Sequence, residues 1–377
     1  MARSKLLIAC PETNADLLYL AGFRAPDAFA YLETAGKKHI LLSDLEIDRG
    51  RAEAKVDSVE AYSEFSKLAE KTPGKTPNYS KVVATWLHSK NVSEVKVPTD
   101  FPFGHARDLK KSGIDVKPVR GPFVPEREIK SRPEVHALEN AIRISEIGMT
   151  RGIEVLRASK ILKDGSLSFN GTHLTSELLR IEMETAVVRA GGEARGDTIV
   201  AGGQQACDPH HRGTGQLFAD QLIILDIFPR DRASWNYGDM TRTYLKGKAT
   251  PEQRRMVTAV KEAHGRMIKA LRAGKTGAEI HRIPVDYFQS LGYHTGPVKG
   301  TYVGFFHGSG HGLGYDIHEE PYLSLRNPAP LQAGNAITVE PGLYYPGIGG
   351  CRFEDCVVIT AQGCELLSKH PYRWEIA

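Results

Sequence analysis

The chain has 377 residues, of which 41% are hydrophobic, 8% aromatic and 25% charged, an ordinary balance for a soluble globular protein. This length is more than one compact core usually holds and therefore predicts two domains. The formal net charge of +4 is too small over such a length to indicate a nucleic-acid or anionic-membrane partner.

The cysteines and the apolar runs indicate the cellular compartment in which the protein is expected. The five cysteines include no CxxC pair, which argues against a disulfide framework and against a zinc-thiolate site. The apolar run at 6–10 is too short for a signal-peptide core, and no run approaches the ~18 apolar residues that a spanning helix needs. We therefore expect a cytoplasmic protein with no membrane partner.

Residues 1–125 are predicted to form a smaller α/β domain. Apolar runs at 5–10, 38–43 and 94–98 predict strands, and the pattern at 78–91 predicts a helix. This domain contains no cluster of potential metal ligands. The proline-rich stretch that follows indicates a linker at 126–132, where the second domain, 133–377, begins with Pro133 at a helix start.

The second domain mixes long helices with strands, so the chain as a whole is assigned to the α+β class. Pro133, Gly191, Pro251 and Gly274 mark expected helix starts or ends, and Pro284 is expected to start or kink a further helix. The segments "QLIILDIF" and "CRFEDCVVIT" are each predicted to be a strand.

Acidic residues follow two of the apolar runs in this domain. Asp226 ends "LIILD", where a carboxylate is costly to bury unless it is paired or binds a metal. In "GDMTRT", Asp239, Thr241 and Thr243 alternate and share one face of a strand, where the hydroxyls could support a ligand carboxylate. Taken singly, Asp226 is more often a strand-end residue that caps a turn, and the segment of Asp239 is more often a surface strand.

Two glutamates occur further along the chain. Glu340 follows "AITV", and Glu354 comes fourteen residues later with Arg352 on the same face of its predicted strand. A hairpin between the two glutamates would bring them together. Each of them alone is also consistent with an ordinary salt bridge.

The stretch "HGSGHGLGYDIHEE" contributes His307, His311 and His318, with glycines at 308, 310, 312 and 314. The glycines predict a backbone that turns sharply and approaches a ligand closely. The spacing fits neither the dinucleotide motif GxGxxG nor the zincin motif HExxH. Three histidines this close together are only a moderate signal for a site.

The ordered set of four carboxylates and one imidazole is more specific than any of its members. It comprises Asp226, Asp239, His311, Glu340 and Glu354. Carboxylates can bridge two cations and offset their charge, so the set predicts two close divalent metal ions. Because it contains no thiolate, Mn²⁺ or Co²⁺ is favoured, with Fe²⁺ and Zn²⁺ as alternatives.

From about residue 133 to the end, the chain resembles the pita-bread metallopeptidases, which comprise methionine aminopeptidase, aminopeptidase P and prolidase. The resemblance rests on "LIILDIF", "YGDMTRT", "HGSGHGLGYDIHEEP", "AITVEPGLYYPG" and "GGCRFED". It implies a C-terminal pita-bread catalytic domain. The preceding α/β segment resembles the N-terminal domain of the prolidase and aminopeptidase P branch, which methionine aminopeptidases usually lack.

The resemblance also implies a role for each metal ligand. Asp226 and Asp239 would bind the first metal, with Asp239 and Glu354 bridging both metals, while His311 and Glu340 would complete the second. A hydroxide bridging the metals would be the nucleophile. The presence of all five ligands counts against the metal-free creatinase branch and against a non-catalytic binding module.

The same resemblance suggests catalytic side chains. His318 would contact the scissile carbonyl or stabilise the tetrahedral intermediate, and His307 would line the same pocket. Glu340 would carry the proton to the leaving nitrogen. A further histidine is expected upstream of the first aspartate. The Pro-His pair in "CDPHHRGTG" favours His210 for that role over His211.

The substrate is less firmly indicated. Arg326 resembles the arginine with which prolidases bind the substrate carboxylate, and Arg352 is a second candidate that could instead orient Glu354. An Xaa-Pro dipeptidase is therefore favoured over an aminopeptidase P acting on longer peptides. Hydrolysis of a non-peptide C–N bond is a remoter alternative, and relatives suggest a homodimer.

The segment between the two aspartates departs from the family pattern. The step from the first to the second is thirteen residues instead of the usual eleven, and Phe228 occupies a position where the family usually has glycine. The segment from Phe228 to Tyr237 is therefore expected to be longer and differently shaped. Trp235 within it is equally consistent with the pocket rim and with surface packing.

Overall fold

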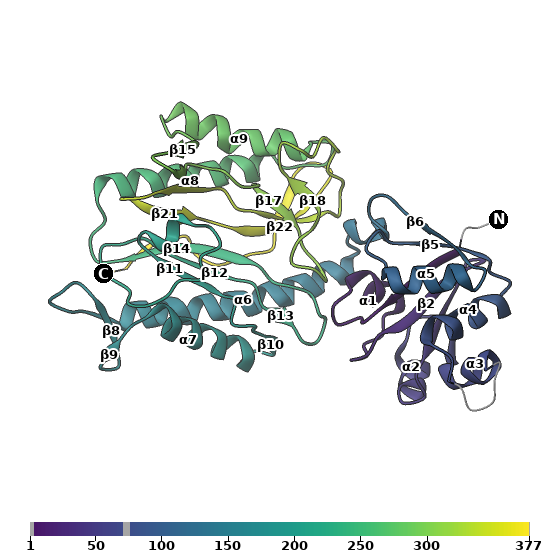
Figure 1. Cartoon of the computed structure of the whole chain (residues 1–377). Helices are drawn as coiled ribbons and strands as arrows, with labels where there is room; N and C mark the ends of the chain where they lie inside the picture. Colours follow the sequence, from purple (N-terminus) through teal and green to yellow (C-terminus); the bar gives the residue numbers. More distant parts are fainter. Residues whose placement is uncertain (1–3, 71–75, 377) are drawn as a thin grey trace. The chain divides into compact units, whose positions relative to one another are not determined.

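The computed structural model describes residues 4–70 and 76–376. The chain divides into two compact units, one ending at Arg127 and the other beginning at Glu128 (Figure 1). Within the described residues, no helix is both long and apolar enough to cross a membrane.

The first unit is a six-stranded sheet in the order β4-β3-β2-β1-β5-β6. Alternation along β1 builds a core on each face: Leu6 and Ile8 pack with Trp86 of α4, whereas Leu7 packs with Leu17 of α1. The strands are β1 (Ser4–Ala9), β2 (Phe29–Thr34), β3 (Lys37–Leu42), β4 (Ser58–Ala61), β5 (Glu94–Val97) and β6 (Asp115–Pro118). The helices are α1 (Ala15–Ala21), α2 (Ile47–Glu53), α3 (Tyr62–Ala69), α4 (Tyr79–Ser89) and α5 (Phe103–Lys111).

The second unit has helix pairs on opposite sides of its strands (Figure 1). Helices α6 (Arg132–Ala158) and α7 (Ser176–Arg189) pack on a four-stranded sheet in the order β11-β12-β14-β24. Helices α8 (Pro251–Ala270) and α9 (Gly277–Ser290) pack on a five-stranded sheet in the order β18-β17-β19-β22-β23. The hairpin of β20 (Gly342–Tyr345) and β21 (Gly349–Arg352) shares a core with α8.

The remaining elements are short. The strands of the four-stranded sheet are β11 (Ile199–Gly202), β12 (Ile223–Ile227), β14 (Met240–Lys246) and β24 (Glu375–Ile376). Those of the five-stranded sheet are β17 (Gly310–Gly312), β18 (Glu319–Leu323), β19 (Ala336–Val339), β22 (Asp355–Ile359) and β23 (Cys364–Leu366). Small ladders use β7 (Lys160–Ile161), β8 (Leu167–Phe169), β9 (Thr172–His173), β10 (Gly192–Glu193), β13 (Arg230–Asp231), β15 (Gly296–Val298) and β16 (Thr301–Val303). Two 3₁₀ turns are η1 (Pro125–Glu128) and η2 (Gln205–Cys207).

Most of the expected helix signals correspond to real boundaries. Ser131 and Thr250 form capping boxes just before the prolines that open α6 and α8. Helix α8 ends at Ala270, earlier than the expected stop at Gly274, and α9 begins before Pro284 and continues through it. Within the predicted linker, Ile129 forms a β-bridge with Asn335.

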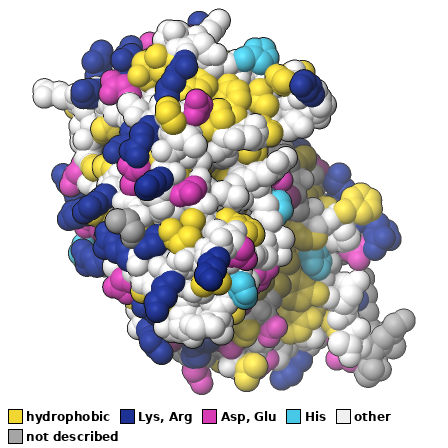
Figure 2. All heavy atoms as spheres, turned by 90° about the vertical axis from the view of Figure 1, so that its left-hand side faces the viewer, with side chains coloured by type: hydrophobic (Ala, Val, Ile, Leu, Met, Phe, Trp, Pro, Cys, Tyr) yellow, Lys and Arg dark blue, Asp and Glu magenta, His cyan; other side chains and the backbone are white. Residues whose placement is uncertain are grey.

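The prediction of a single strand over "CRFEDCVVIT" is wrong. The chain leaves β21 at Arg352 and enters β22 at Asp355, because β21 pairs with β20 while β22 pairs with β19 in another sheet. Glu354 lies at this crossing between two sheets. On the face drawn in Figure 2, Lys and Arg side chains are interspersed with acidic and hydrophobic ones, in keeping with the modest net charge.

Candidate metal centre

Strand alternation in β12 directs the side chain of Asp226 away from helices α6 and α7. Leu225 and Ile227 belong to the core under α6 and α7, so the side chain between them lies on the opposite face of the sheet. In the register, Asp226 is paired with Thr241 of β14, and Asp239 directly precedes that strand. Two neighbouring antiparallel strands therefore bring the two aspartates to the same side.

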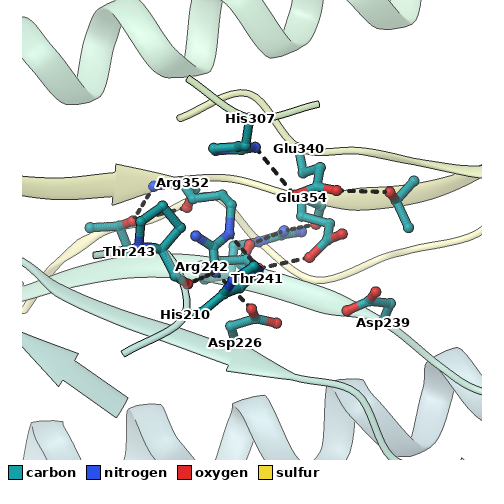
Figure 3. A network of polar contacts seen from close by, with 12 residues as sticks. His210, Asp226, Asp239, Thr241, Arg242, Thr243, His307, Glu340, Arg352 and Glu354 are labelled. Carbon is teal, nitrogen blue, oxygen red and sulfur yellow. Dashed lines mark hydrogen bonds and ion pairs between the residues drawn. The ribbon is translucent and has the colours of Figure 1, made fainter. Parts of the chain in front are cut away.

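The two glutamates approach this pair from the other sheet. Glu340 follows the end of β19, the β20–β21 hairpin intervenes, and Glu354 follows the hairpin, as the hairpin hypothesis required. The backbone N–H of Glu354 donates to the carbonyl oxygen of Thr241 at 3.0 Å, which joins the crossing point to β14. Figure 3 shows the carboxylates of Glu340 and Glu354 facing the region of Asp226 and Asp239.

All five predicted metal ligands line one cavity of about 490 Å³. Its charged and imidazole-bearing lining residues are Asp197, His210, Arg212, Asp226, Asp239, His307, His311, His318, Glu340, Arg352 and Glu354. Its other lining residues are Ile199, Pro209, Phe228, Gly308, Gly310, Ile317 and Tyr322, so no cysteine contributes to the wall. The cavity thus contains the oxygen and nitrogen donors of the set without a thiolate.

The spacing of the donor atoms suits cation binding. Possible ligand atoms of Asp239, His311 and Glu354 all lie within 4.8 Å of one another. The Nε2 atom of His311 is 3.5 Å from Asp239 Oδ2 and 3.5 Å from Glu340 Oε1. Its Nδ1 atom lies 3.0 Å from the carbonyl oxygen of Gly312, so a proton on Nδ1 would leave Nε2 with its lone pair directed at the carboxylates.

The buried acids repel one another. Burial and the charge of Asp226 raise the pKa of Glu354 to about 7. Burial and the neighbouring Glu354 also raise the pKa of Asp239 and that of Glu340. Burial lowers the pKa of His311 to about 4, so this imidazole is neutral at pH 7 and supplies no balancing charge.

A divalent cation fits this donor set. Among the described residues, the buried Oδ1 atom of Asp226 has no hydrogen-bond partner, although a buried carboxylate oxygen normally has one. A neutral imidazole together with crowded carboxylates is a ligand chemistry that suits divalent cations of the first transition series. Cations at this position would satisfy the unpaired oxygen and remove the repulsion.

Hydroxyl groups hold the ligand side chains in place. Thr241 Oγ1 donates to Glu354 Oε2 at 2.7 Å, as the hypothesis of a supporting hydroxyl requires, whereas Thr243 exchanges hydrogen bonds with the backbone of Arg352. Sequence reasoning missed Thr338, which accepts from the His311 backbone N–H at 3.1 Å and lies 3.4 Å from Glu340 Oε1. Its position in the apolar run "AITVE" was the one available signal.

Arg352 binds protein groups in the cavity wall. Its Nη2 donates to Asp226 Oδ2 at 2.7 Å, and its Nη1 donates to the hydroxyl of Tyr344 at 2.9 Å. The guanidinium is buried and bonded to these protein partners, so its role as a substrate-carboxylate ligand stays a prediction that these contacts do not favour. The acid that Arg352 bonds directly is Asp226, and its link to Glu354 runs through Thr241, whose hydroxyl accepts from Arg352 Nε at 3.3 Å and donates to Glu354.

The histidines differ in their environments. His307 lies 2.8 Å through Nε2 from the Tyr344 hydroxyl, and burial lowers its pKa to about 3. The ring of His318 packs edge-on against that of His311, with 4.4 Å between centroids. His210 lines the cavity, whereas His211 is not among the lining residues and its Nδ1 accepts from the backbone N–H of Gly213 at 2.9 Å.

Some expectations do not match the observed positions. Arg326 is exposed and is not one of the residues that line the cavity. Trp235 likewise does not line it, and its ring lies 4.0 Å from the guanidinium of Arg230. None of the four glycines has a positive φ, and Gly308 and Gly310 line the cavity, in keeping with the expected close approach to a ligand. Close packing also requires glycine here, because a Cβ at Gly310 or Gly312 would lie 2.0 or 2.3 Å from a carbonyl oxygen of a neighbouring strand.

Another buried pair that sequence reasoning missed supports the histidine segment from outside the cavity. His281 of α9 and Ser309 are hydrogen-bonded at 2.5 Å between Nδ1 and Oγ. Ser309 is fully buried between His307 and His311, and its carbonyl oxygen accepts from the backbone N–H of Glu340 at 2.8 Å. In the sequence, a single histidine in an amphipathic helix gave no indication of this contact.

A cavity lined by convergent carboxylates and an imidazole offers the donor set of a metal-dependent enzyme. The comparison with known families identifies the class more closely: residues 136–361 match metallopeptidase family M24. The chain belongs to this family and is a metallopeptidase.

Relatives and solved structures agree with this assignment. The chain is 26% identical to the Xaa-Pro dipeptidase of Pyrococcus horikoshii over 365 residues, covering 94% of this chain and 91% of that protein. It is 30% identical to the Xaa-Pro dipeptidase of Pyrococcus furiosus over 247 residues, which is 64% of each.

The pita-bread fold is confirmed by solved structures. The X-Pro aminopeptidase of Thermotoga maritima has a TM-score of 0.82 at 22% identity, with 100% of this chain and 97% of that chain covered. The Xaa-Pro dipeptidase of Bacillus anthracis has a TM-score of 0.82 at 24% identity, with 99% and 95% covered.

Proposed function

We propose that this protein is a di-metal peptidase that hydrolyses Xaa-Pro bonds, with dipeptides as its preferred substrates. The observation that carries the proposal is the convergence of four carboxylates and His311 on one cavity in a chain of family M24. The substrate class is suggested by the Xaa-Pro dipeptidases to which the chain is similar over most of its length.

The proposed metal ligands are Asp226, Asp239, His311, Glu340 and Glu354. We favour two Mn²⁺ or Co²⁺ ions, because the donors are oxygen and imidazole nitrogen, with Fe²⁺ and Zn²⁺ as alternatives. Such a pair, when bound, would supply an activated water and stabilise negative charge on the substrate oxygen.

The chain's own side chains would move the proton and stabilise the carbonyl oxygen. Glu340 lies at the cavity wall and would take a proton from the attacking water and give it to the leaving nitrogen. Burial lowers the pKa of His318, so its imidazole is neutral and can donate one N–H to the oxygen on which charge develops. His210 and His307 would contact the bound peptide from the same wall.

Arg352 would act as a positioning residue. Its guanidinium links Asp226 to Tyr344, and the Tyr344 hydroxyl is in turn hydrogen-bonded to His307. Because Arg352 donates to the tyrosine oxygen, that hydroxyl is free to donate its own proton to His307 Nε2. The bonds connect a proposed ligand with a proposed substrate contact.

The proposal is tested with metal-stripped protein and with protein reloaded with Mn²⁺ or Co²⁺, assayed on Ala-Pro and on Ala-Pro-Ala. We expect metal-dependent cleavage of both, with Ala-Pro preferred. Glu354→Gln should abolish it, while Glu365→Gln, a matched change of an exposed acid on β23, should not. Failure to cleave either peptide in any metal state would contradict the proposed function, and cleavage of the longer peptide alone would favour the aminopeptidase P alternative.

We also propose that the protein acts in the cytoplasm as a homodimer. All five cysteines are free thiols, which is compatible with a reducing compartment. The dimer rests on the family resemblance alone. Light scattering of the purified protein would give its mass, and a monomer at micromolar concentration would contradict the dimer.

A further inference from the structure

The cavity contains two positively charged side chains among the described residues that line it, Arg212 and Arg352. Arg352 is buried and already bound to Asp226 and Tyr344. The side chain of Arg212 is 63% exposed, and its Nη2 lies 2.5 Å from Asp197 Oδ1. Arg212 is therefore the guanidinium in this wall that an incoming anion can reach.

The backbone of Arg212 is fixed even though its side chain is exposed. Its carbonyl oxygen accepts from the backbone N–H of Val200 in β11 at 2.9 Å and from the guanidinium of Arg180 in α7. Arg212 also lies two residues after His210, which lines the same cavity. A substrate held against His210 would thus meet a guanidinium whose backbone is anchored to the sheet.

The ion pair with Asp197 can be exchanged at low cost. The Asp197 side chain is 34% exposed, and an ion pair between exposed side chains is usually worth only about 0–1 kcal/mol. A carboxylate bound within the cavity would compete well for the guanidinium, because Arg binds carboxylates bidentately in a planar geometry. Asp197 would hold the side chain in place until the substrate arrives.

We propose that Arg212 binds the C-terminal carboxylate of the dipeptide substrate and so selects dipeptides over longer peptides. This inference rests on the proposed function, and it replaces Arg326 in the role that the sequence suggested. In a dipeptide the free carboxylate lies one residue beyond the scissile bond. In a longer peptide a neutral peptide group occupies that position, and the charged contact is lost.

The test compares Ala-Pro with Ala-Pro-amide, which differ only in the C-terminal charge. Arg212→Gln should lower kcat/KM for Ala-Pro by roughly 10- to 100-fold, mainly through KM, as expected for a hydrogen bond to a charged group. It should leave the amide nearly unchanged. Arg212→Lys should restore part of the loss, and Asp197→Asn should lower KM for Ala-Pro by freeing the guanidinium.

A matched control is Arg254→Gln in α8, an exposed arginine paired with Glu375 and outside the lining of the cavity, which should affect neither substrate. Equal loss on both substrates, or no loss on Ala-Pro, overturns the assignment of Arg212. A selective rise in KM for Ala-Pro in Arg326→Gln, with Arg212→Gln unaffected, also overturns it. Wild-type protein that cleaves neither substrate would contradict the proposed function itself, which distinguishes the two failures.

Discussion

Replacing Thr241 by valine should weaken metal binding while leaving the fold intact. Valine keeps the shape of the side chain but lacks the hydroxyl that donates to Glu354 Oε2 at 2.7 Å. Thr241 is fully buried and Glu354 is 2% exposed, so water cannot take the place of the lost donor. The hydrogen bond favours the ionised carboxylate, which is the form that binds a metal.

The size of the effect follows from that geometry. A hydrogen bond to a charged group contributes about 1.5–3 kcal/mol, which corresponds to about a 10- to 100-fold change in an equilibrium constant. Loss of a group that orients a metal ligand has an effect of about the same size. We therefore expect the Kd for Mn²⁺ to rise about 10- to 100-fold in Thr241→Val.

Thr243→Val is the matched control, since Thr243 lies on the same strand face and is also fully buried. Its hydroxyl bonds to the backbone of Arg352 at 2.9 and 3.0 Å and to no ligand carboxylate. Calorimetric titration of metal-stripped proteins with Mn²⁺ gives Kd, and thermal melts in chelator give stability. The reasoning is refuted if Thr241→Val binds Mn²⁺ like the wild type, or if Thr243→Val loses affinity equally.

Further predictions concern pH, packing and the histidine segment. Burial and Asp226 raise the folded-state pKa of Glu354 to about 7. The metal-stripped protein should therefore lose stability as the pH rises from about 5 to about 7, because the unfolded chain has already released this proton in that range. Thermal melts would measure the loss, and Mn²⁺ should reverse the trend. Gly238→Ala should lower stability by about 1–3 kcal/mol in denaturant titrations, because its Cβ would lie 2.2 Å from a carbonyl oxygen of α6. Gly265→Ala, which has open space within α8, should instead stabilise the protein by about 0.5–1 kcal/mol. Ser309→Ala, which loses the bond to a buried histidine of α9, should lower kcat roughly two- to tenfold, and an unchanged kcat would contradict its positioning role.

The metal ligands could be predicted from the sequence because each one occupies a recognisable local position. Asp226 interrupts an apolar strand, Glu340 follows another, and His311 lies in a glycine-rich run. Burial of such polar groups is costly without a partner, so their order along the chain was informative even without knowledge of the contacts. The fold class and the helix starts followed similarly from periodicity and capping residues.

The partners of these residues could not be predicted, because they depend on contacts between distant segments. Arg352 and Asp226 are 126 residues apart, and no spacing rule connects them. Arg326 was assigned by its distance along the chain from Glu340, but a loop position does not determine whether a side chain faces a cavity. The glycines of 308–314 illustrate a different limit, since close packing between strands and a sharp turn favour the same residue.

Charge connects the metal centre with the proposed anchor at Arg212. In the cavity, four proposed ligand carboxylates face one buried guanidinium, that of Arg352, while Asp197 and Arg212 offset each other. Two divalent cations with a bridging hydroxide would bring the remaining charge of minus three to zero, so the loaded cavity would no longer repel an anionic group as the stripped cavity does. A dipeptide presents its carboxylate one residue beyond the scissile bond, and a longer peptide does not. Affinity for Ala-Pro should therefore depend on metal loading more steeply than affinity for Ala-Pro-amide. Competition binding of the two peptides, repeated over a series of Mn²⁺ concentrations from stripped to fully loaded protein, measures the difference, and equal dependence for both would contradict this reasoning.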